Sequence, residues 1–212
     1  MRRRSFIQLS AMSLLPSSLF AVWSGQALAQ APSVDVEAIL HDPDAPAAGN
    51  PKGDITIVAF LDYNCPFCKK SAPDLARVVK EDGRIRLVYK DWPILTKASV
   101  YGAQLALAAN YQGRYQEVHD ALMAIPGRQI PEEQMLKAIQ ATHVDLDQLA
   151  ADANNRIGDI ADLLKRNNAQ ASSLGLQGTP TYLVGPLLAS TLDYASFKRA
   201  VAEARRQQAL AK

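Results

Sequence analysis

The stretch at residues 54–70 reads DITIVAFLDYNCPFCKK and holds the only two cysteines of a chain of 212 residues. Its first half is mostly apolar and β-branched with no polar alternation, which predicts a strand that is covered on both faces. From Pro66 the pattern becomes helical, so the strand ends shortly before Cys65 and Cys68. The cysteine pair is therefore expected where a buried strand passes into a helix.

Three uses of this cysteine pair have to be weighed: a structural disulfide, half of a zinc site, or a reactive thiol pair. A disulfide that closes so short a loop constrains the unfolded chain very little. Zinc needs four ligands, and the sequence offers no second cysteine pair and only scattered histidines, namely His41, His119 and His143. A redox pair is the favoured interpretation, and we expect no metal site and no cofactor.

The position of Cys65 predicts how such a pair would react. If Pro66 is the first helical residue, Cys65 lies at the N-cap, where unpaired backbone N–H groups and the helix dipole favour an anion. A thiolate is that anion, and a lower thiol pKa makes Cys65 both more reactive and a better leaving group. Cys68 lies one helical turn further on, and we expect it to be more buried and to resolve the mixed disulfide.

The rest of the chain predicts two halves of an α/β sheet. Residues 84–93 read as a second strand, residues 178–185 as a third and residues 186–191 as a weak fourth, before a last helix capped by Asp193. Residues 97–175 show helical patterns only. The sequence thus predicts an α/β fold in which an all-helical insertion separates the second and third strands.

Pro180 gives an independent signal in the segment GTPTY, residues 178–182. A proline cannot donate a hydrogen bond to a strand ladder, and a trans proline at a strand edge would be the ordinary interpretation. Because the chain also carries the Cys65–Cys68 motif, we expect the Thr179–Pro180 bond to be cis. Thr179 would then present free backbone N–H and C=O groups that could hold a substrate strand beside Cys65. Thr179 and Pro180 are therefore the predicted substrate-binding residues.

Four polar residues outside the motifs receive simpler interpretations. Lys90 and Asp91, which close the predicted second strand, are expected to be surface charges. His119 is interpreted as a helix-packing or surface residue. Asp62, three positions before Cys65, is a candidate for a buried proton-transfer group.

The first residues of the chain predict export. Arg2, Arg3 and Arg4 precede an apolar run and a small-x-small site, so residues 1–29 are expected to be a cleavable signal, removed before Gln30, of the secretory or the twin-arginine type. Residues 30–53 read as an N-terminal arm with one short helix, and residues 54–210 as the domain itself. Loss of the three arginines changes the formal net charge from +2 to −1, which gives no reason to expect nucleic acid as a partner.

Several motifs in the same order carry a family resemblance. FLDYNCPFCKK at residues 60–70, the helical block, and GLQGTPTYLVG at residues 175–185 together resemble the DsbA-type thioredoxin-fold oxidoreductases over about residues 52–208. GNPKGDITIVAFLDYNCPFC at 49–68 and DWPIL at 91–95 further resemble the bacterial branch that includes ScsC and Com1-like proteins.

The resemblance implies a thioredoxin fold and assigns roles to the motif residues. By resemblance, Cys65 is the nucleophile, Cys68 is the resolving thiol, and Pro66 and Phe67 form the dipeptide that tunes the redox potential. Thr179 precedes the cis-proline. In the strongly oxidising members this dipeptide often ends in histidine, so Phe67 predicts a less oxidising pair.

The implied activity is disulfide exchange in the periplasm with unfolded or misfolded exported proteins, with a preference for disulfide donation. A membrane partner resembling DsbB would reoxidise a donor, whereas one resembling DsbD would keep an isomerase or reductase reduced. We expect a monomer. The alternatives are an ScsC-like isomerase or reductase and a copper(I)-binding protein linked to metal tolerance, since copper(I) prefers soft thiolates. A surface antigen of the Com1 type, with both cysteines dispensable, is a third reading.

Overall fold

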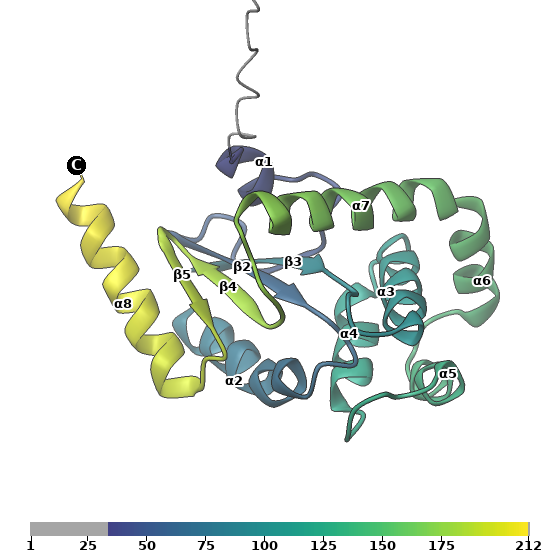
Figure 1. Cartoon of the computed structure of the whole chain (residues 1–212). Helices are drawn as coiled ribbons and strands as arrows, with labels where there is room; N and C mark the ends of the chain where they lie inside the picture. Colours follow the sequence, from purple (N-terminus) through teal and green to yellow (C-terminus); the bar gives the residue numbers. More distant parts are fainter. Residues whose placement is uncertain (1–33, 212) are drawn as a thin grey trace, which may run out of the picture. The chain divides into compact units, whose positions relative to one another are not determined.

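A mixed five-stranded sheet forms the centre of the protein. The computed structural model describes residues 34–211, so the predicted signal at residues 1–29 and its cleavage point before Gln30 lie outside the described residues. The strand order is β1-β3-β2-β4-β5, with β2 and β3 parallel and the other pairs antiparallel (Figure 1). The strands are β1 (Ala47–Gly49), β2 (Ile55–Leu61), β3 (Ile85–Asp91), β4 (Thr181–Val184) and β5 (Leu187–Ser190).

Helices cover both faces of this sheet. On one face α2 and α8 pack together, and on the other face lie α1 and α7 (Figure 1). The helices are α1 (Val36–Leu40), α2 (Pro66–Asp82), α3 (Lys97–Asn110), α4 (Tyr115–Ala124), α5 (Glu132–Gln140), α6 (Leu146–Asn155), α7 (Ile157–Ser173) and α8 (Tyr194–Leu210).

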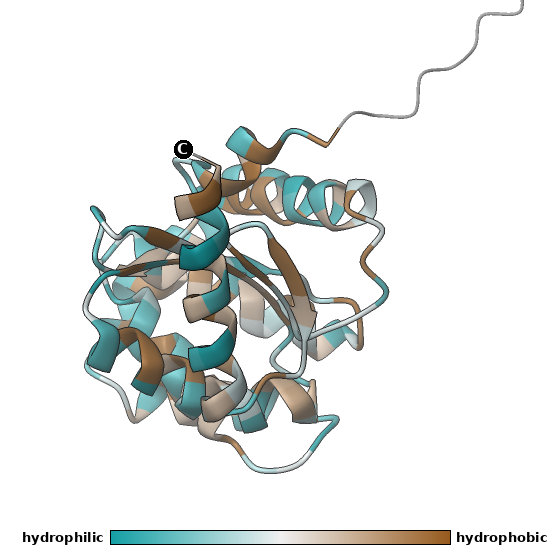
Figure 2. Cartoon of the chain, turned by 90° about the vertical axis from the view of Figure 1, so that its left-hand side faces the viewer, coloured by the Kyte–Doolittle hydropathy of each residue, from teal (hydrophilic) through white to brown (hydrophobic). Residues whose placement is uncertain are grey.

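Strand β2 is buried on both faces, as its sequence predicts. Ile57 and Ala59 contribute to the core beneath α2 and α8, whereas Val58 and Phe60 point into the smaller core beneath α1 and α7. Figure 2 shows the central strands as largely apolar ribbon. Because apolar contacts hold both faces, the end of β2 gives a fixed base for the cysteine pair that follows.

The predicted α/β fold with an all-helical insertion is confirmed. Five helices, α3 to α7, follow one another between β3 and β4, which are the second and third predicted strands. The weak fourth strand is present as β5, and Asp193 caps α8 by accepting a hydrogen bond from the N–H of Ser196 at 2.8 Å. The insertion therefore extends from the same edge of the sheet at which β2 delivers Cys65.

Strand β1 is an element that the sequence did not predict. It lies within the residues that were interpreted as an arm, and it pairs antiparallel with β3, with Ala48 opposite Leu87. Gly49 ends it at a φ of +73°, a conformation that favours glycine. This segment is part of the sheet, and it protects the outer edge of β3 from unpaired exposure.

The prediction that Lys90 and Asp91 are surface charges is wrong. Both side chains are buried, on opposite faces of β3. The Lys90 Nζ lies 2.8 Å from Oδ2 of Asp42, whose carboxylate also binds Arg166 of α7 at 2.9 Å. Distant segments thus cover the end of the strand and supply the opposite charge that a buried lysine needs.

Candidate active site

Cys65 is the N-cap of α2, as the sequence predicts. Its backbone is extended, with φ −83° and ψ 116°, and its Sγ accepts a hydrogen bond from the backbone N–H of Cys68 at 3.4 Å. Pro66 takes the first helical position, where the missing N–H leaves no hydrogen bond unmade. The sulfur therefore lies in the field of the first turn, where negative charge is stabilised.

The two thiols differ in their surroundings in the expected sense. Both are free, with Cys65 3% exposed and Cys68 fully buried. Phe67, between them, is 55% exposed and presents its ring to solvent. Cys65 keeps a small exposed surface whereas Cys68 keeps none, so a reacting group meets Cys65 first.

The second predicted motif lies directly against the first. The Thr179–Pro180 peptide bond is cis, as predicted, and the thiol of Cys65 donates a hydrogen bond to the carbonyl oxygen of Thr179 at 3.1 Å. Pro180 leads into β4, which pairs with β2. The fold thus brings together four of the predicted site residues, Cys65, Cys68, Thr179 and Pro180, from two segments far apart in the chain.

These contacts separate the acidities of the two thiols. A hydrogen bond from the Cys68 thiol lowers the pKa of Cys65 to about 6, against the opposing effect of burial. The Thr179 hydroxyl and the backbone N–H groups of Phe67 and Cys68 act in the same direction. Burial, together with the neighbouring Cys65 thiolate, raises the pKa of Cys68. At neutral pH the site can hold a Cys65 thiolate and a Cys68 thiol.

Asp62 holds the approach to the cysteines in place. Its backbone carbonyl accepts the N–H of Cys65 at 3.1 Å, and its buried carboxylate accepts the N–H of Asn64 at 2.7 Å. The same carboxylate accepts the N–H groups of Ile94 and Leu95 at 2.9 and 3.0 Å. With its oxygens occupied by backbone donors, Asp62 has a positioning role in place of the proton transfer considered from the sequence.

Asn64 is a site residue that the sequence analysis missed. Its Oδ1 accepts the N–H of Ile130 at 2.6 Å, and its Nδ2 donates to Thr96 Oγ1 at 2.8 Å. The active-site segment is thereby tied to two loops of the helical insertion. Tyr63 and Asn64 are two polar residues directly before Cys65, at the end of an otherwise apolar strand. This change of character is the sequence signal that could have indicated the role of Asn64.

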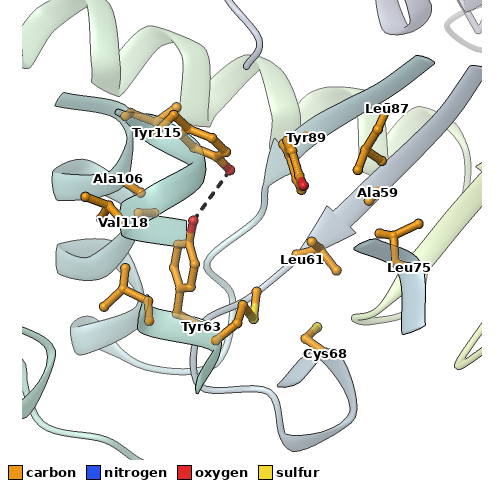
Figure 3. Close-up of a cluster of buried hydrophobic side chains, with 14 of the residues drawn as sticks. Ala59, Leu61, Tyr63, Cys68, Leu75, Leu87, Tyr89, Ala106, Tyr115 and Val118 are labelled. Carbon is orange, nitrogen blue, oxygen red and sulfur yellow. Dashed lines mark hydrogen bonds between the residues drawn. The ribbon is translucent and has the colours of Figure 1, made fainter. Parts of the chain in front are cut away.

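A buried polar cluster lies behind the cysteine segment. The Tyr63 hydroxyl lies 3.4 Å from that of Tyr115 (Figure 3). Tyr115 donates to Asp91 Oδ2 at 3.0 Å, and the Tyr63 hydroxyl also lies 3.1 Å from Nδ1 of His119. Burial raises the pKa of Asp91 to about 7 and lowers the pKa of His119 to about 3. His119 is thus a neutral packing residue, stacked on Tyr115 at 5.7 Å between ring centroids.

The described part of the chain holds neither a candidate metal cluster nor a membrane-spanning helix. Within residues 34–211, no three side chains of His, Cys, Asp or Glu gather as ligands of a metal ion. No helix in these residues combines the length and apolar character that crossing a membrane requires.

A comparison with protein families matches residues 41–203 to the model described as thioredoxin. The chain belongs to the thioredoxin family. Within this family it is similar to a solved thioredoxin-like oxidoreductase from Silicibacter pomeroyi DSS-3, with 36% identity, a TM-score of 0.74 and coverage of 80% of this chain and 97% of that one. It is also similar to the thiol-disulfide exchange protein alpha-DsbA2 of Wolbachia pipientis, with 26% identity, a TM-score of 0.73 and coverage of 79% and 90%. The resemblance to DsbA-type proteins is confirmed.

Two further matches are more distant or cover only part of the relative. The catalytic domain of Proteus mirabilis ScsC shares the fold, with a TM-score of 0.67 at 22% identity over 79% of this chain and 93% of that one. Among curated proteins, a Na(+)/H(+) antiporter NhaA 1 of Salinispora arenicola is 31% identical over 147 residues, 68% of this chain. The chain spans only 22% of the length of that relative, so the match concerns one part of a larger protein.

Proposed function

We propose that this protein is a thiol:disulfide oxidoreductase that exchanges disulfides with exported proteins through Cys65. The observation that carries the proposal is the environment of the Cys65 sulfur, which accepts the Cys68 N–H at 3.4 Å and lies 3.1 Å from the Thr179 carbonyl oxygen. A sulfur with a lowered pKa and a slightly exposed surface, next to a fully buried thiol one turn away, is the arrangement that disulfide exchange needs.

The donor reaction begins with a disulfide between Cys65 and Cys68. A substrate thiolate attacks Cys65 Sγ, which forms a mixed disulfide and expels the Cys68 thiolate; that thiolate then takes up a proton. A second substrate thiolate attacks the substrate sulfur of the mixed disulfide and expels the Cys65 thiolate. The substrate gains a disulfide, and the two electrons remain on the protein as two reduced cysteines. In the reverse direction Cys65 attacks and Cys68 resolves.

The lowered pKa of Cys65 supports disulfide donation by a protein of moderate oxidising strength. At pH 7 a fall in the thiol pKa from 9.0 to about 6 favours the reduced form about tenfold, which corresponds to about 30 mV. For a thiol with a pKa of about 3.5, as in a strong oxidant, the rise in reduction potential is several times larger. Phe67 adds no hydrogen-bond donor at the position where histidine could supply one. We therefore infer a donor that is weaker than the strongest oxidants.

The substrate is placed by the backbone of Thr179 beside Cys65. A polypeptide in a mixed disulfide with Cys65 passes the Thr179–Pro180 segment, whose backbone groups can pair with an extended strand. The signal expected at residues 1–29 supports a periplasmic location, where exported proteins acquire disulfides. A quinone-linked membrane partner resembling DsbB would reoxidise the cysteines. We place the signal at residues 1–29 and the functional domain at 54–210, to which the segment at 30–53 adds strand β1 through its pairing with β3.

Equilibration with glutathione buffers at pH 7 tests the direction of exchange. The fraction of the Cys65–Cys68 disulfide is measured by mass spectrometry after acid quenching and thiol alkylation. A potential between about −120 and −200 mV fits a donor, because such a pair is reduced by most protein thiols. A potential below about −230 mV would overturn donation and assign the protein to reduction or isomerisation, driven by a partner resembling DsbD.

A further inference from the structure

The peptide group between Phe67 and Cys68 connects the Cys65 sulfur to a buried serine. The N–H of this group, which belongs to Cys68, donates to Cys65 Sγ at 3.4 Å. Its carbonyl oxygen, which belongs to Phe67, accepts a hydrogen bond from Oγ of Ser71 at 3.0 Å. A peptide group whose carbonyl accepts a hydrogen bond becomes a stronger donor through its N–H, because the two bonds polarise the same group. The Ser71 hydroxyl therefore acts on the bond to the sulfur through this peptide group.

A second hydroxyl extends the chain of hydrogen bonds to the sheet. The hydroxyl oxygen of Tyr182, in β4, lies 2.5 Å from Ser71 Oγ. The carbonyl oxygens of Phe67 and Cys68, at 3.0 and 3.3 Å from Ser71 Oγ, can only accept, so they take the single proton of Ser71. The proton between the two hydroxyl oxygens then comes from Tyr182. Donation therefore runs from Tyr182 to Ser71, to the peptide group and on to the Cys65 sulfur.

Both hydroxyl-bearing side chains are held firmly in the core. Ser71 is buried in α2, and Tyr182 is fully buried with its ring edge-on to Phe197 of α8, at 4.9 Å between ring centroids. Tyr182 also pairs with Ala59 of β2 and follows Pro180 by two positions. In these surroundings water does not compete for the hydroxyl groups, and hydrogen bonds polarise one another more strongly than in water.

We propose that Tyr182 and Ser71 form a hydrogen-bond relay that strengthens the bond from the Cys68 N–H to the Cys65 thiolate and thereby makes the cysteine pair more oxidising. This inference rests on the proposed function. The thiolate exists only in the reduced protein, so the relay favours the reduced form and with it the transfer of the disulfide to a substrate. Ser71 and Tyr182 act through the peptide group, and they are positioning residues.

The first experiment measures the equilibrium of the cysteine pair with glutathione at pH 7 and the titration of the Cys65 thiolate at 240 nm. The whole mature chain is used as wild type and as Ser71→Ala, Tyr182→Phe and Ser71→Thr. Ser172→Ala is a matched control, since Ser172 makes the same bond to a carbonyl four residues back, in α7, at 2.9 Å. Tyr89→Phe is the second control, because it also removes a tyrosine hydroxyl that bonds to a side chain at 2.9 Å.

We expect Ser71→Ala to lower the equilibrium constant for oxidation of glutathione about threefold and to raise the measured thiol pKa by about half a unit, because the charge-assisted bond to the sulfur is weakened. Tyr182→Phe should lower the constant about 1.5- to twofold. Ser71→Thr retains a hydroxyl and should restore the wild-type value, and both controls should equal the wild type. Wild-type constants in Ser71→Ala and Tyr182→Phe would overturn the proposal.

The amide proton of Cys68 distinguishes a relay from a packing effect. Its chemical shift in the reduced protein, measured by two-dimensional ¹H–¹⁵N NMR, reports the strength of the bond to the sulfur. The relay predicts an upfield shift in Tyr182→Phe, which changes no residue of α2, and none in Tyr89→Phe. An unchanged Cys68 amide in Tyr182→Phe would overturn the relay even if the equilibrium constant had fallen.

Failure of the proposed function gives a different result. If the wild-type cysteine pair does not exchange with glutathione and does not pass its disulfide to a reduced peptide, the proposed function fails and the relay fails with it. If the wild type exchanges normally and the variants of Ser71 and Tyr182 match it, only the relay is overturned. Tyr182→Phe keeps the aromatic ring in the core, so this comparison remains available if Ser71→Ala does not fold.

Discussion

The Cys65 sulfur lies 3.1 Å from the carbonyl oxygen of Thr179, a residue that is 114 positions later in the chain. Helix α2, strand β3 and the helical insertion all intervene between them in sequence, so the contact depends on correct closure of the whole domain. The same sulfur accepts the N–H of Cys68, its neighbour one helical turn away. Local helix geometry therefore activates the thiol, and the tertiary fold places a backbone beside it.

Replacement of Cys68 by alanine should raise the pKa of Cys65. The hydrogen bond from the Cys68 thiol is the largest cause that lowers this pKa to about 6. The thiolate absorbance at 240 nm, followed from pH 4 to 10, should show its transition near pH 6 in the reduced wild type and about one unit or more higher in the variant. An unchanged transition in the variant would mean that the helix N-terminus alone sets the acidity of Cys65.

Replacement of Phe67 by histidine should make the disulfide more oxidising. A histidine at this exposed position can donate a hydrogen bond to the Cys65 thiolate or place a positive charge near it, which stabilises the reduced form. Each unit by which the thiol pKa falls below the working pH raises the potential by about 30 mV. Equilibration with glutathione measures the shift, and Phe67→Leu serves as a control that adds no donor. A potential that is equal in both variants would contradict this account.

Asp42 should contribute to stability at neutral pH and lose that contribution in acid. Burial by itself raises the pKa of Asp42, but hydrogen bonds from Arg166 and Lys90 outweigh it and lower the pKa to about 2. Since this value lies below that of the unfolded chain, the stabilisation is complete above about pH 4 and is lost as the pH falls through about 2.

The variant Asp42→Asn should lower the free energy of unfolding at pH 7 by about 3–5 kcal/mol, because Lys90 is left buried without its counter-charge. Urea unfolding at pH 7 and at pH 3 measures this loss, which should be smaller at pH 3. Asp44→Asn is the matched control, since Asp44 binds the same Arg166 but its side chain is 67% exposed. A loss of the same size in both variants would contradict a special role for the buried pair.

Asp91 should have the opposite effect on the pH dependence of stability. Burial raises its pKa to about 7, so the folded protein retains a proton that the unfolded chain has released, and stability falls as the pH rises from about 4 to about 7. Asp91→Asn removes the ionisation and can still accept the Tyr115 hydrogen bond. We expect the variant to be more stable than the wild type at pH 8 and to differ little at pH 5. Urea unfolding with equal destabilisation at both pH values would contradict the assignment.

The parts of the site that the sequence predicts are those that depend on local chemistry. The buried strand and the N-cap position of Cys65 each follow from a few neighbouring residues, whereas the cis bond before Pro180 is expected because the cysteine motif is present elsewhere in the chain. Strand β1 could not be predicted in this way. It is three residues long, it ends in glycine, and only its pairing with β3 makes it a strand.

Long-range partners explain the errors in the polar residues. Lys90 and Asp91 resemble surface charges because nothing near them in sequence neutralises or covers them. Their partners, Asp42 and Tyr115, come from distant segments on opposite faces of β3. The positioning role of Asp62 is hidden for the same reason, since the N–H groups that it accepts include those of a loop beyond the next strand.

The most direct test of the central claim is to trap the mixed disulfide. The variants Cys68→Ala and Cys65→Ala are each mixed with a peptide that carries a cysteine in disulfide linkage to glutathione, and the products are analysed by intact mass and peptide mapping. The account predicts that Cys68→Ala accumulates an adduct at Cys65 because no resolving thiol remains, and that Cys65→Ala forms none because Cys68 is buried with a raised pKa. An adduct at Cys68, or the absence of an adduct in both variants, would contradict it.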